Sequence, residues 1–202
     1  MSDDNGHETR FDGRDPLGPG TIVPFGDIAA EIVRRGEDFV VRVRDPKSPA
    51  LHSFVGVPTF PVNEAWVIPA KYLAFEKPHL ISVGASVEGL EHVCTAPGEV
   101  MFNFNGTEHS LTVFSGKQGR PVVLFTDATS GVSTYKASRK LIIGQGSEST
   151  IGSSAAHLEL DFNRALNLPC AFIDFATCPL PPVGNHLRFP VTAGERTPHR
   201  NR

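Results

Sequence analysis

EVMFNFNGTEHSLTVF, residues Glu99 to Phe114, is the stretch that decides the fold class. Apolar and polar residues alternate on both sides of Asn105-Gly106, a dipeptide typical of tight turns between antiparallel strands. Large apolar side chains flank this turn on both sides: Phe102, Phe104, Leu111 and Val113. The stretch therefore predicts a β-hairpin, with a loop of two residues or longer.

Strand-like apolar patterns recur in seven other segments: Asp38–Asp45, Ala65–Ala70, His79–Ser86, Pro121–Asp127, Lys140–Gly144, Leu158–Phe162 and His186–Thr192. Gly and Pro residues separate many of them, as they separate the short strands of all-β proteins. We expect Val122 to Phe125 to pair with the second strand of the hairpin. The sequence therefore predicts a mostly β protein, an antiparallel barrel or sandwich.

One short N-terminal helix is expected over DIAAEIVRR, Asp27 to Arg35. Its first residue suits a helix N-cap, and Gly36 suits the position after the last turn. Ile28, Ile32 and Val33 would form the apolar stripe. This spacing is typical of an amphipathic helix.

Length and composition indicate a single globular domain. The chain has 202 residues, of which 40% are hydrophobic and 20% charged, so it can bury most of its apolar surface. The composition of residues 1–20 predicts a disordered tail, and residues 197–202 are expected to form a second, short tail. The expected domain extends from residue 21 to residue 196. Within it, residues 144–154 predict a flexible loop that could cover a barrel mouth.

The net charge of the chain argues against some classes of binding partner. A net charge of −3 and a pI near 6.2 give no electrostatic reason to expect nucleic acid or an anionic membrane as a partner. The chain has no apolar run of the roughly 18 residues that cross a bilayer. Its polar N-terminus does not resemble a secretory signal. We therefore expect a cytoplasmic protein whose partner, if it has one, is a small molecule.

The cysteines do not predict a metal site. Cys170 and Cys178 are separated by seven residues, whereas zinc sites usually pair cysteines two to four residues apart. His186 could add a third ligand, but the set remains incomplete. We expect buried thiols and neither metal nor cofactor, with a disulfide formed by oxidation as the alternative.

TDATSGVSTYKASRKL, Thr126 to Leu141, is the first segment that could carry chemistry. Asp127 ends a predicted strand, where a carboxylate often accepts backbone N–H bonds in a turn. The alternative is a catalytic carboxylate. Tyr135 and Arg139 could direct a hydroxyl and a planar guanidinium at a carboxylate or phosphate.

LDFNRALN, Leu160 to Asn167, is the second such segment. Period-two alternation places Asp161 and Asn163 together, on the side opposite Phe162. Two interpretations stay open: these side chains cap the following turn, or they line a polar cavity. In both cases, we expect Arg139 or Arg164 to pair with a nearby carboxylate, because an unpaired buried charge is costly.

VVRVRDPKSP, Val40 to Pro49, presents a pair of arginines. Alternation places Arg42 and Arg44 on one face of a strand, with Val41 and Val43 on the other. This face could be solvated, or it could face the inside of a barrel.

These motifs resemble a bacterial family, domain of unknown function 1684. The resemblance rests on VRVRDPKSP, on FTDATSGVSTYKASRKL and on LDFNRALNLPCAFIDFATCPLPPVGNHLRFPVTAGER. It extends from about Arg34 to Arg196 and implies no activity. It does imply that one recurring pattern contains the polar residues Arg42, Arg44, Asp127, Tyr135, Arg139, Asp161, Asn163, Asn185 and Glu195.

The leading hypothesis is a protein whose polar pocket binds a small anionic or polar molecule. The expected ligand-binding residues are Arg42, Arg44, Arg139, Asn163, Asn185 and Glu195.

An enzymatic alternative is a hydrolase or lyase, in which Asp127 or Asp161 acts as the base and Tyr135 as the acid. Arg139 would then hold the anion. A third possibility is a structural or protein-interaction module in which the charged groups only satisfy one another.

Overall fold

A computed structural model describes residues 22–35, 38–116, 119–144, 155–174 and 176–199 of the chain. The chain divides into a smaller unit that ends at Val55 and a larger unit that begins at Gly56. Among the described residues, no helix is both long and apolar enough to cross a membrane. The predicted tail at residues 1–20 and most of the predicted flexible loop, residues 145–154, lie outside the described residues.

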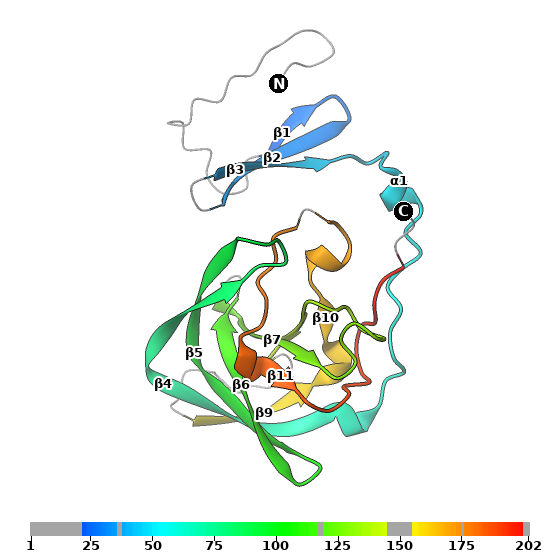
Figure 1. Ribbon diagram of the computed structural model, residues 1–202. Helices are drawn as coiled ribbons and strands as arrows, with labels where there is room; N and C mark the ends of the chain where they lie inside the picture. The colour runs from blue at the N-terminus through cyan, green and yellow to red at the C-terminus, as the bar shows by residue number, and fades with distance from the viewer. Residues whose placement is uncertain (1–21, 36–37, 117–118, 145–154, 175, 200–202) are drawn as a thin grey trace. The chain divides into compact units, whose positions relative to one another are not determined.

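The smaller unit contains a three-stranded antiparallel sheet (Figure 1). Its strands are β1 (Ile22–Phe25), β2 (Ile28–Arg35) and β3 (Asp38–Arg44), in the order β1-β2-β3. Phe25 pairs with Ile28, so Gly26 and Asp27 form the turn between the first two strands. A short helix, α1 (Pro49–His52), follows β3.

The predicted helix over Asp27–Arg35 is wrong, because this segment forms the turn and strand β2. Ile28, Ile32 and Val33 are β-branched, and such residues fit strands better than helices. Gly26 has a φ of 56°, a conformation that suits a tight turn. The apolar spacing alone therefore did not distinguish the two structures.

The larger unit is built on a strongly curled antiparallel half-barrel, which confirms the mostly β prediction (Figure 1). The strand order is β10-β8-β7-β6-β5-β4-β9, and β11 pairs with β7 in parallel. The strands are β4 (Val67–Gly84), β5 (Glu91–Phe104), β6 (Thr107–Ser115), β7 (Pro121–Asp127), β8 (Arg139–Ile142), β9 (Ala155–Asp161), β10 (Leu166–Asn167) and β11 (His186–Leu187). Short 3₁₀ turns cover Glu64–Trp66, Phe162–Arg164, Pro169–Ala171 and Val183–Asn185.

The predicted hairpin is confirmed in β5 and β6. Phe104 pairs with Thr107, which leaves Asn105 and Gly106 as a two-residue loop. Their φ angles are 51° and 77°, as the favoured hairpin turns require. The expected pairing of the second hairpin strand with the next strand is also confirmed, since Val113 lies opposite Val123.

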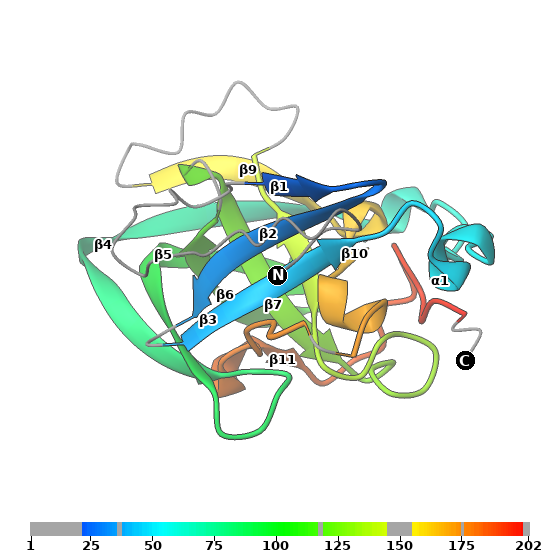
Figure 2. The same cartoon turned by 90° about the horizontal axis from the view of Figure 1, so that it is seen from above.

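Strand β4 joins two segments that the sequence predicts as separate strands. It continues through Lys71–Pro78, where the charged residues interrupt the apolar pattern. The register of β4 against β5 shifts between Ala74 and His79, and such bulges bend a strand and increase its twist. Gly98 of β5 lies directly over Tyr72, where a Cβ atom would collide with the Leu73 carbonyl oxygen. Both features allow the two long strands to curve across the unit (Figure 2).

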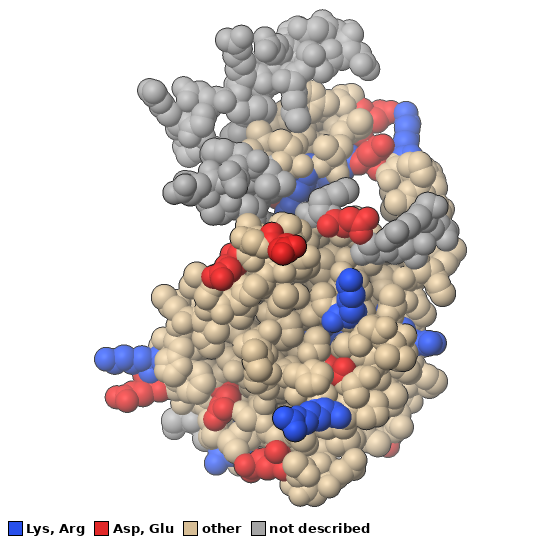
Figure 3. All heavy atoms as spheres, in the orientation of Figure 1, with Lys and Arg blue, Asp and Glu red and all other residues tan. Residues whose placement is uncertain are grey.

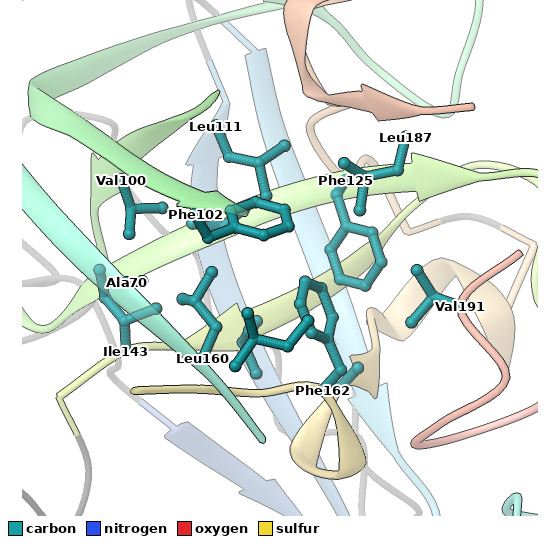
Figure 4. Close-up of a cluster of buried hydrophobic side chains, with 14 of the residues drawn as sticks. Ala70, Val100, Phe102, Leu111, Phe125, Ile143, Leu160, Phe162, Leu187 and Val191 are labelled. Carbon is teal, nitrogen blue, oxygen red and sulfur yellow. The ribbon is translucent and has the colours of Figure 1, made fainter. Parts of the chain in front are cut away.

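Aromatic rings fill the inside of the half-barrel. Phe162 is fully buried, and its ring centroid lies 5.5 Å from that of Phe125 and 6.0 Å from that of Phe102. Figure 4 shows these three rings pointing toward one another between the strands, with Leu187 and Val191 beside them. Burying a ring of this size contributes about 2–3 kcal/mol to stability. The core therefore joins the sheet to the chain segments that follow β9.

A second apolar cluster lies on the other face of β6 and β7. Neighbouring residues of a strand point to opposite faces, so Val113 and Val123 join the inner core while Phe114 and Leu124 join the second cluster. Cys170 and Cys178 pack into this second cluster. Burial on both faces explains the continuous apolar run of β7.

Replacing Gly194 with alanine should destabilise the larger unit far more than replacing Gly89. Both glycines have positive φ angles, 74° and 79°, so each substitution costs about 1 kcal/mol in backbone strain. At Gly194, the added Cβ would also lie 2.6 Å from the Ala165 carbonyl oxygen, whereas at Gly89 it meets nothing within 4 Å. We expect a total cost of about 3 kcal/mol for Gly194→Ala. Urea unfolding of both variants measures the difference, and equal costs would contradict the close approach.

Candidate functional site

A buried ion pair connects the end of β7 to the start of β8. The Arg139 Nη2 atom lies 2.7 Å from Asp127 Oδ2, and the two side chains are 1% and 0% exposed. Arg139 pairs with Phe125 across the strands, and its guanidinium carbon lies 5.1 Å above the Phe125 ring. The predicted pairing of an arginine with one of the carboxylates is confirmed here.

The two Nη atoms of the Arg139 guanidinium form hydrogen bonds to protein groups. Its Nη1 atom donates to the carbonyl oxygens of Ala193 at 2.6 Å and Glu195 at 3.4 Å, and its Nη2 donates to that of Val191 at 3.0 Å. Burial lowers the pKa of Arg139, but the Asp127 carboxylate opposes this shift. An arginine remains charged in proteins. This geometry favours a bracing role for Arg139 over contact with a ligand.

Arg139 Nε is buried without a hydrogen-bond partner among the described residues, whereas both oxygens of the Asp127 carboxylate have partners. Asp127 Oδ1 accepts hydrogen bonds from the Thr129 backbone N–H at 2.7 Å, the Thr129 hydroxyl at 2.6 Å and the Val191 N–H at 3.1 Å. Asp127 and Arg139 therefore hold Val191 by its N–H and its carbonyl oxygen respectively. These contacts agree with the first interpretation of Asp127, a carboxylate at a strand end that accepts backbone N–H bonds in a turn.

Glu195 fixes the C-terminal segment at a second point. Its Oε2 accepts a hydrogen bond from the Asn167 N–H at 2.6 Å, and its own N–H donates to the Ala165 carbonyl oxygen at 2.9 Å. Asn167 Nδ2 donates to the Arg196 carbonyl oxygen at 2.8 Å. Glu195 thus contacts protein groups rather than an open cavity.

Asp161 and Asn163 cap the turn that follows β9. Asp161 Oδ1 accepts hydrogen bonds from the Asn163 backbone N–H at 3.1 Å and from its Nδ2 at 3.0 Å. Asn163 then bonds the N–H and carbonyl of Asn63 at 3.0 and 2.9 Å. Arg164 approaches Asp161 only to 3.9 Å, at the surface. Of the two interpretations that the sequence left open, these contacts favour the cap.

The Asn185 side chain takes the place of a backbone hydrogen-bonding partner between β6 and β7. Its Oδ1 accepts from the Thr112 N–H at 2.8 Å, and its Nδ2 donates to the carbonyl oxygens of Thr112 at 2.9 Å and Leu124 at 2.8 Å. The residue is fully buried. It therefore satisfies backbone groups where β11 lies beside β7, as buried polar groups require.

Tyr135 lies against the cysteine segment. Its hydroxyl donates to the Cys170 carbonyl oxygen at 2.8 Å. Cys170 and Cys178 are buried and form no disulfide, as the sequence predicts for thiols. Tyr135, Asp127 and Asp161 each bond different groups.

Arg42 and Arg44 belong to the smaller unit, where both bind Glu31. The Arg44 guanidinium lies 2.7 Å from Glu31 Oε2, and that of Arg42 lies at 3.5 Å. The hydrogen bond from Arg44 lowers the pKa of Glu31, although burial opposes the shift. Both arginines stand on the same face of β3, as alternation predicts, and both are largely exposed.

An open pocket of about 570 Å³ lies beside β11. Its lining residues are Thr126, Pro181, Pro182, Val183, Gly184, His186 and Arg188. His186 is the register partner of Thr126, and its Nδ1 lies 3.0 Å from the Thr126 hydroxyl. Among the described residues, no hydrogen bond or ion pair engages the exposed Arg188 guanidinium. The exposed Arg188 guanidinium is therefore open to solvent where it lines this pocket.

The sequence patterns did not predict this pocket. They indicated His186 only as part of an incomplete metal site, and they indicated no role for Thr126 or Arg188. His186 and Arg188 are two residues apart in GNHLRF. In a strand this spacing places two side chains on the same face, which is a weak indication that they act together. Nothing local connects them to Thr126, because that contact depends on the parallel pairing of β11 with β7.

Comparison with known proteins identifies the family. The family model described as a protein of unknown function (DUF1684) matches residues 52–196. The chain belongs to this family. The DUF1684 chain is also similar to an uncharacterized protein from Haloarcula marismortui, whose solution NMR structure has 27% sequence identity and a TM-score of 0.59. The match covers 76% of this chain and 83% of that one. Curated proteins give no match.

Arg139→Gln should strongly destabilise this DUF1684 protein. The change leaves the buried Asp127 carboxylate without its cation, which costs about 3–5 kcal/mol in free energy of unfolding. Arg188→Gln is the matched control, because its side chain is exposed and the expected change is within about 0.5 kcal/mol. Thermal and urea unfolding of both variants measure the two costs. A small loss for Arg139→Gln would instead support contact with a ligand.

Asn185→Ala should remove the side-chain partner of three backbone groups of Thr112 and Leu124, which are partly or fully buried. We expect a cost of about 2–4 kcal/mol, since each unsatisfied group is expensive. Asn103→Ala provides the control, because Asn103 is exposed and accepts one hydrogen bond, from the Gly106 N–H at 3.1 Å. Its loss should cost about 1 kcal/mol or less. Urea unfolding compares the two, and equal costs would show that the Asn185 amide is not needed between the strands.

Proposed function

We propose that this protein binds a small anionic molecule in the open pocket beside β11. One observation carries the proposal: Arg188 and His186 line the same pocket, and the Arg188 guanidinium is exposed without a partner in the part of the chain that the structure describes. A free guanidinium offers donors in a geometry that matches carboxylate and phosphate oxygens. His186 bonds Thr126 through Nδ1, which leaves its other ring nitrogen for the ligand.

The size of the pocket supports a small ligand. Its volume of about 570 Å³ falls within the range of roughly 300–1,000 Å³ that is typical of small-molecule sites. The net charge of the chain is only −3, and charged side chains of both signs are interspersed on the face shown in Figure 3. Attraction of an anion would therefore depend on local groups such as Arg188.

The buried network supports the same proposal by fixing the pocket walls. Thr126 immediately precedes Asp127, and Leu187 is the register partner of Asp127. The ion pair of Asp127 with Arg139 therefore holds the strand from which Thr126 extends. Binding sites supported by buried contacts keep their geometry without a ligand.

The acid–base alternative has less support. Asp127 is paired with Arg139, Asp161 caps a turn, and Tyr135 bonds the Cys170 carbonyl. A general base needs a free lone pair within hydrogen-bond reach of its substrate. We therefore place the ligand at Arg188 rather than at these three residues.

Anion titration tests the proposal. Inorganic phosphate, sulfate and succinate are added separately to the purified full chain at constant ionic strength, and the melting temperature is recorded. A specific ligand at a hundred times its Kd stabilises the fold by about 2.7 kcal/mol. We expect at least one anion to raise the melting temperature, and Arg188→Gln to weaken its binding about tenfold by isothermal titration calorimetry.

The matched control is Arg164→Gln, which removes an exposed arginine that does not line the pocket. This variant should bind the anion like the wild type. The proposal fails if none of the three anions binds, or if both variants lose affinity equally.

A further inference from the structure

Two thiols from one segment meet inside the second apolar cluster. The Cys170 backbone N–H donates to Cys178 Sγ at 3.2 Å, and the residues are 3% and 7% exposed. An N–Cα bond is about 1.46 Å long, so this sulfur lies within about 4.7 Å of the Cys170 Cα atom. That distance is within the span of a disulfide from the Cys170 side chain.

Hydrogen bonds hold the backbone of both cysteines in place. Ser86, just after β4, accepts from the Cys178 N–H through its Oγ at 3.0 Å and donates its own N–H to the Cys178 carbonyl oxygen at 2.8 Å. On the other side, the Cys170 carbonyl oxygen accepts a hydrogen bond from the Tyr135 hydroxyl at 2.8 Å. The contact between the thiols is therefore supported from two separate parts of the chain.

The two thiols have different acidities. A hydrogen bond from Cys178 lowers the pKa of Cys170 to about 6, although burial opposes this shift. The same interaction, together with burial, raises the pKa of Cys178. Burial also raises the pKa of Cys94. A more acidic thiol beside a less acidic one is the arrangement that favours attack by the first and resolution by the second.

We propose that Cys170 and Cys178 form a redox-active dithiol, which hydroperoxides oxidise reversibly to a Cys170–Cys178 disulfide. Nothing in the family description or in the pocket beside β11 assigns such a site. The depth of the pair limits the oxidant to a small molecule, and hydrogen peroxide fits this limit.

The reaction has two balanced steps. The Cys170 thiolate attacks one oxygen of hydrogen peroxide, the O–O bond breaks, and sulfenic acid forms while hydroxide leaves and takes a proton to become water. The Cys178 sulfur then attacks the Cys170 sulfur, the S–O bond breaks, and the departing oxygen leaves as a second water with the Cys178 proton. The dithiol loses two electrons, and the peroxide gains them.

Peroxide treatment of the reduced, full-length protein tests the inference. The chain has three cysteines, so we expect free thiols to fall from three to one, with Cys94 retained and reduction by dithiothreitol restoring the others. Cleavage before Asp174 separates Cys170 from Cys178 in the sequence. Mass spectrometry should then find these two peptides linked by a disulfide.

Three variants distinguish the roles of the cysteines. Cys94→Ser should react like the wild type, and Cys170→Ser should leave Cys178 reduced. Cys178→Ser should stop the reaction at the Cys170 sulfenic acid, which a dimedone probe labels. The inference is overturned if Cys94 oxidises as fast as Cys170, if the linked peptides contain Cys94, or if thiols are lost only in denaturant. The peptide mapping of the wild type decides the matter even where a variant does not fold.

Discussion

The larger unit depends on one buried ion pair, Asp127 with Arg139. Desolvating two charges is expensive, and a buried pair adds little net stability compared with apolar residues of the same volume. Its effect here is on the path of the chain, because Asp127 and Arg139 bind the N–H and the carbonyl of Val191. Arg139 also binds the carbonyl oxygens of Ala193 and Glu195. The pair therefore selects one arrangement of the C-terminal segment against the sheet.

This arrangement has consequences for the surface. The segment that the ion pair fixes begins just after β11, and β11 brings His186 beside Thr126. Asn185 completes the junction by bonding backbone groups of Thr112 and Leu124. The polar residues of the C-terminal block thus act mainly from inside the fold, while the proposed anion site uses the neighbouring groups that remain exposed.

The sheet separates two kinds of environment. Its inner face carries aromatic packing around Phe162, which contributes stability through apolar burial. Its other face, at β6 and β7, packs against the segment that contains Cys170 and Cys178. Pro181, which lines the anion pocket, follows Cys178 by three residues. The proposed binding and redox properties are tested by different variants, Arg188→Gln for the first and the cysteine variants for the second.

The sequence by itself determined the mostly β fold, the β5–β6 hairpin and the family. These features rest on local information: period-two alternation, the turn preference of Asn105-Gly106 and a long matching block. It also anticipated that Arg139 would pair with a carboxylate, because an unpaired buried charge is too costly. Local patterns could not decide the structure of Asp27–Arg35, where β-branched residues fit both a helical stripe and a strand.

Only the tertiary structure decided the roles of the polar residues. The same carboxylate can serve as a base, a cap or half of an ion pair, and its partners determine which. For Asp127 those partners include Arg139 and Val191, the second of which is distant in the chain. The pocket likewise exists only because β11 pairs in parallel with β7. Such contacts depend on strand register and chain path, which the cooperative packing of the whole unit sets and no short stretch of sequence encodes.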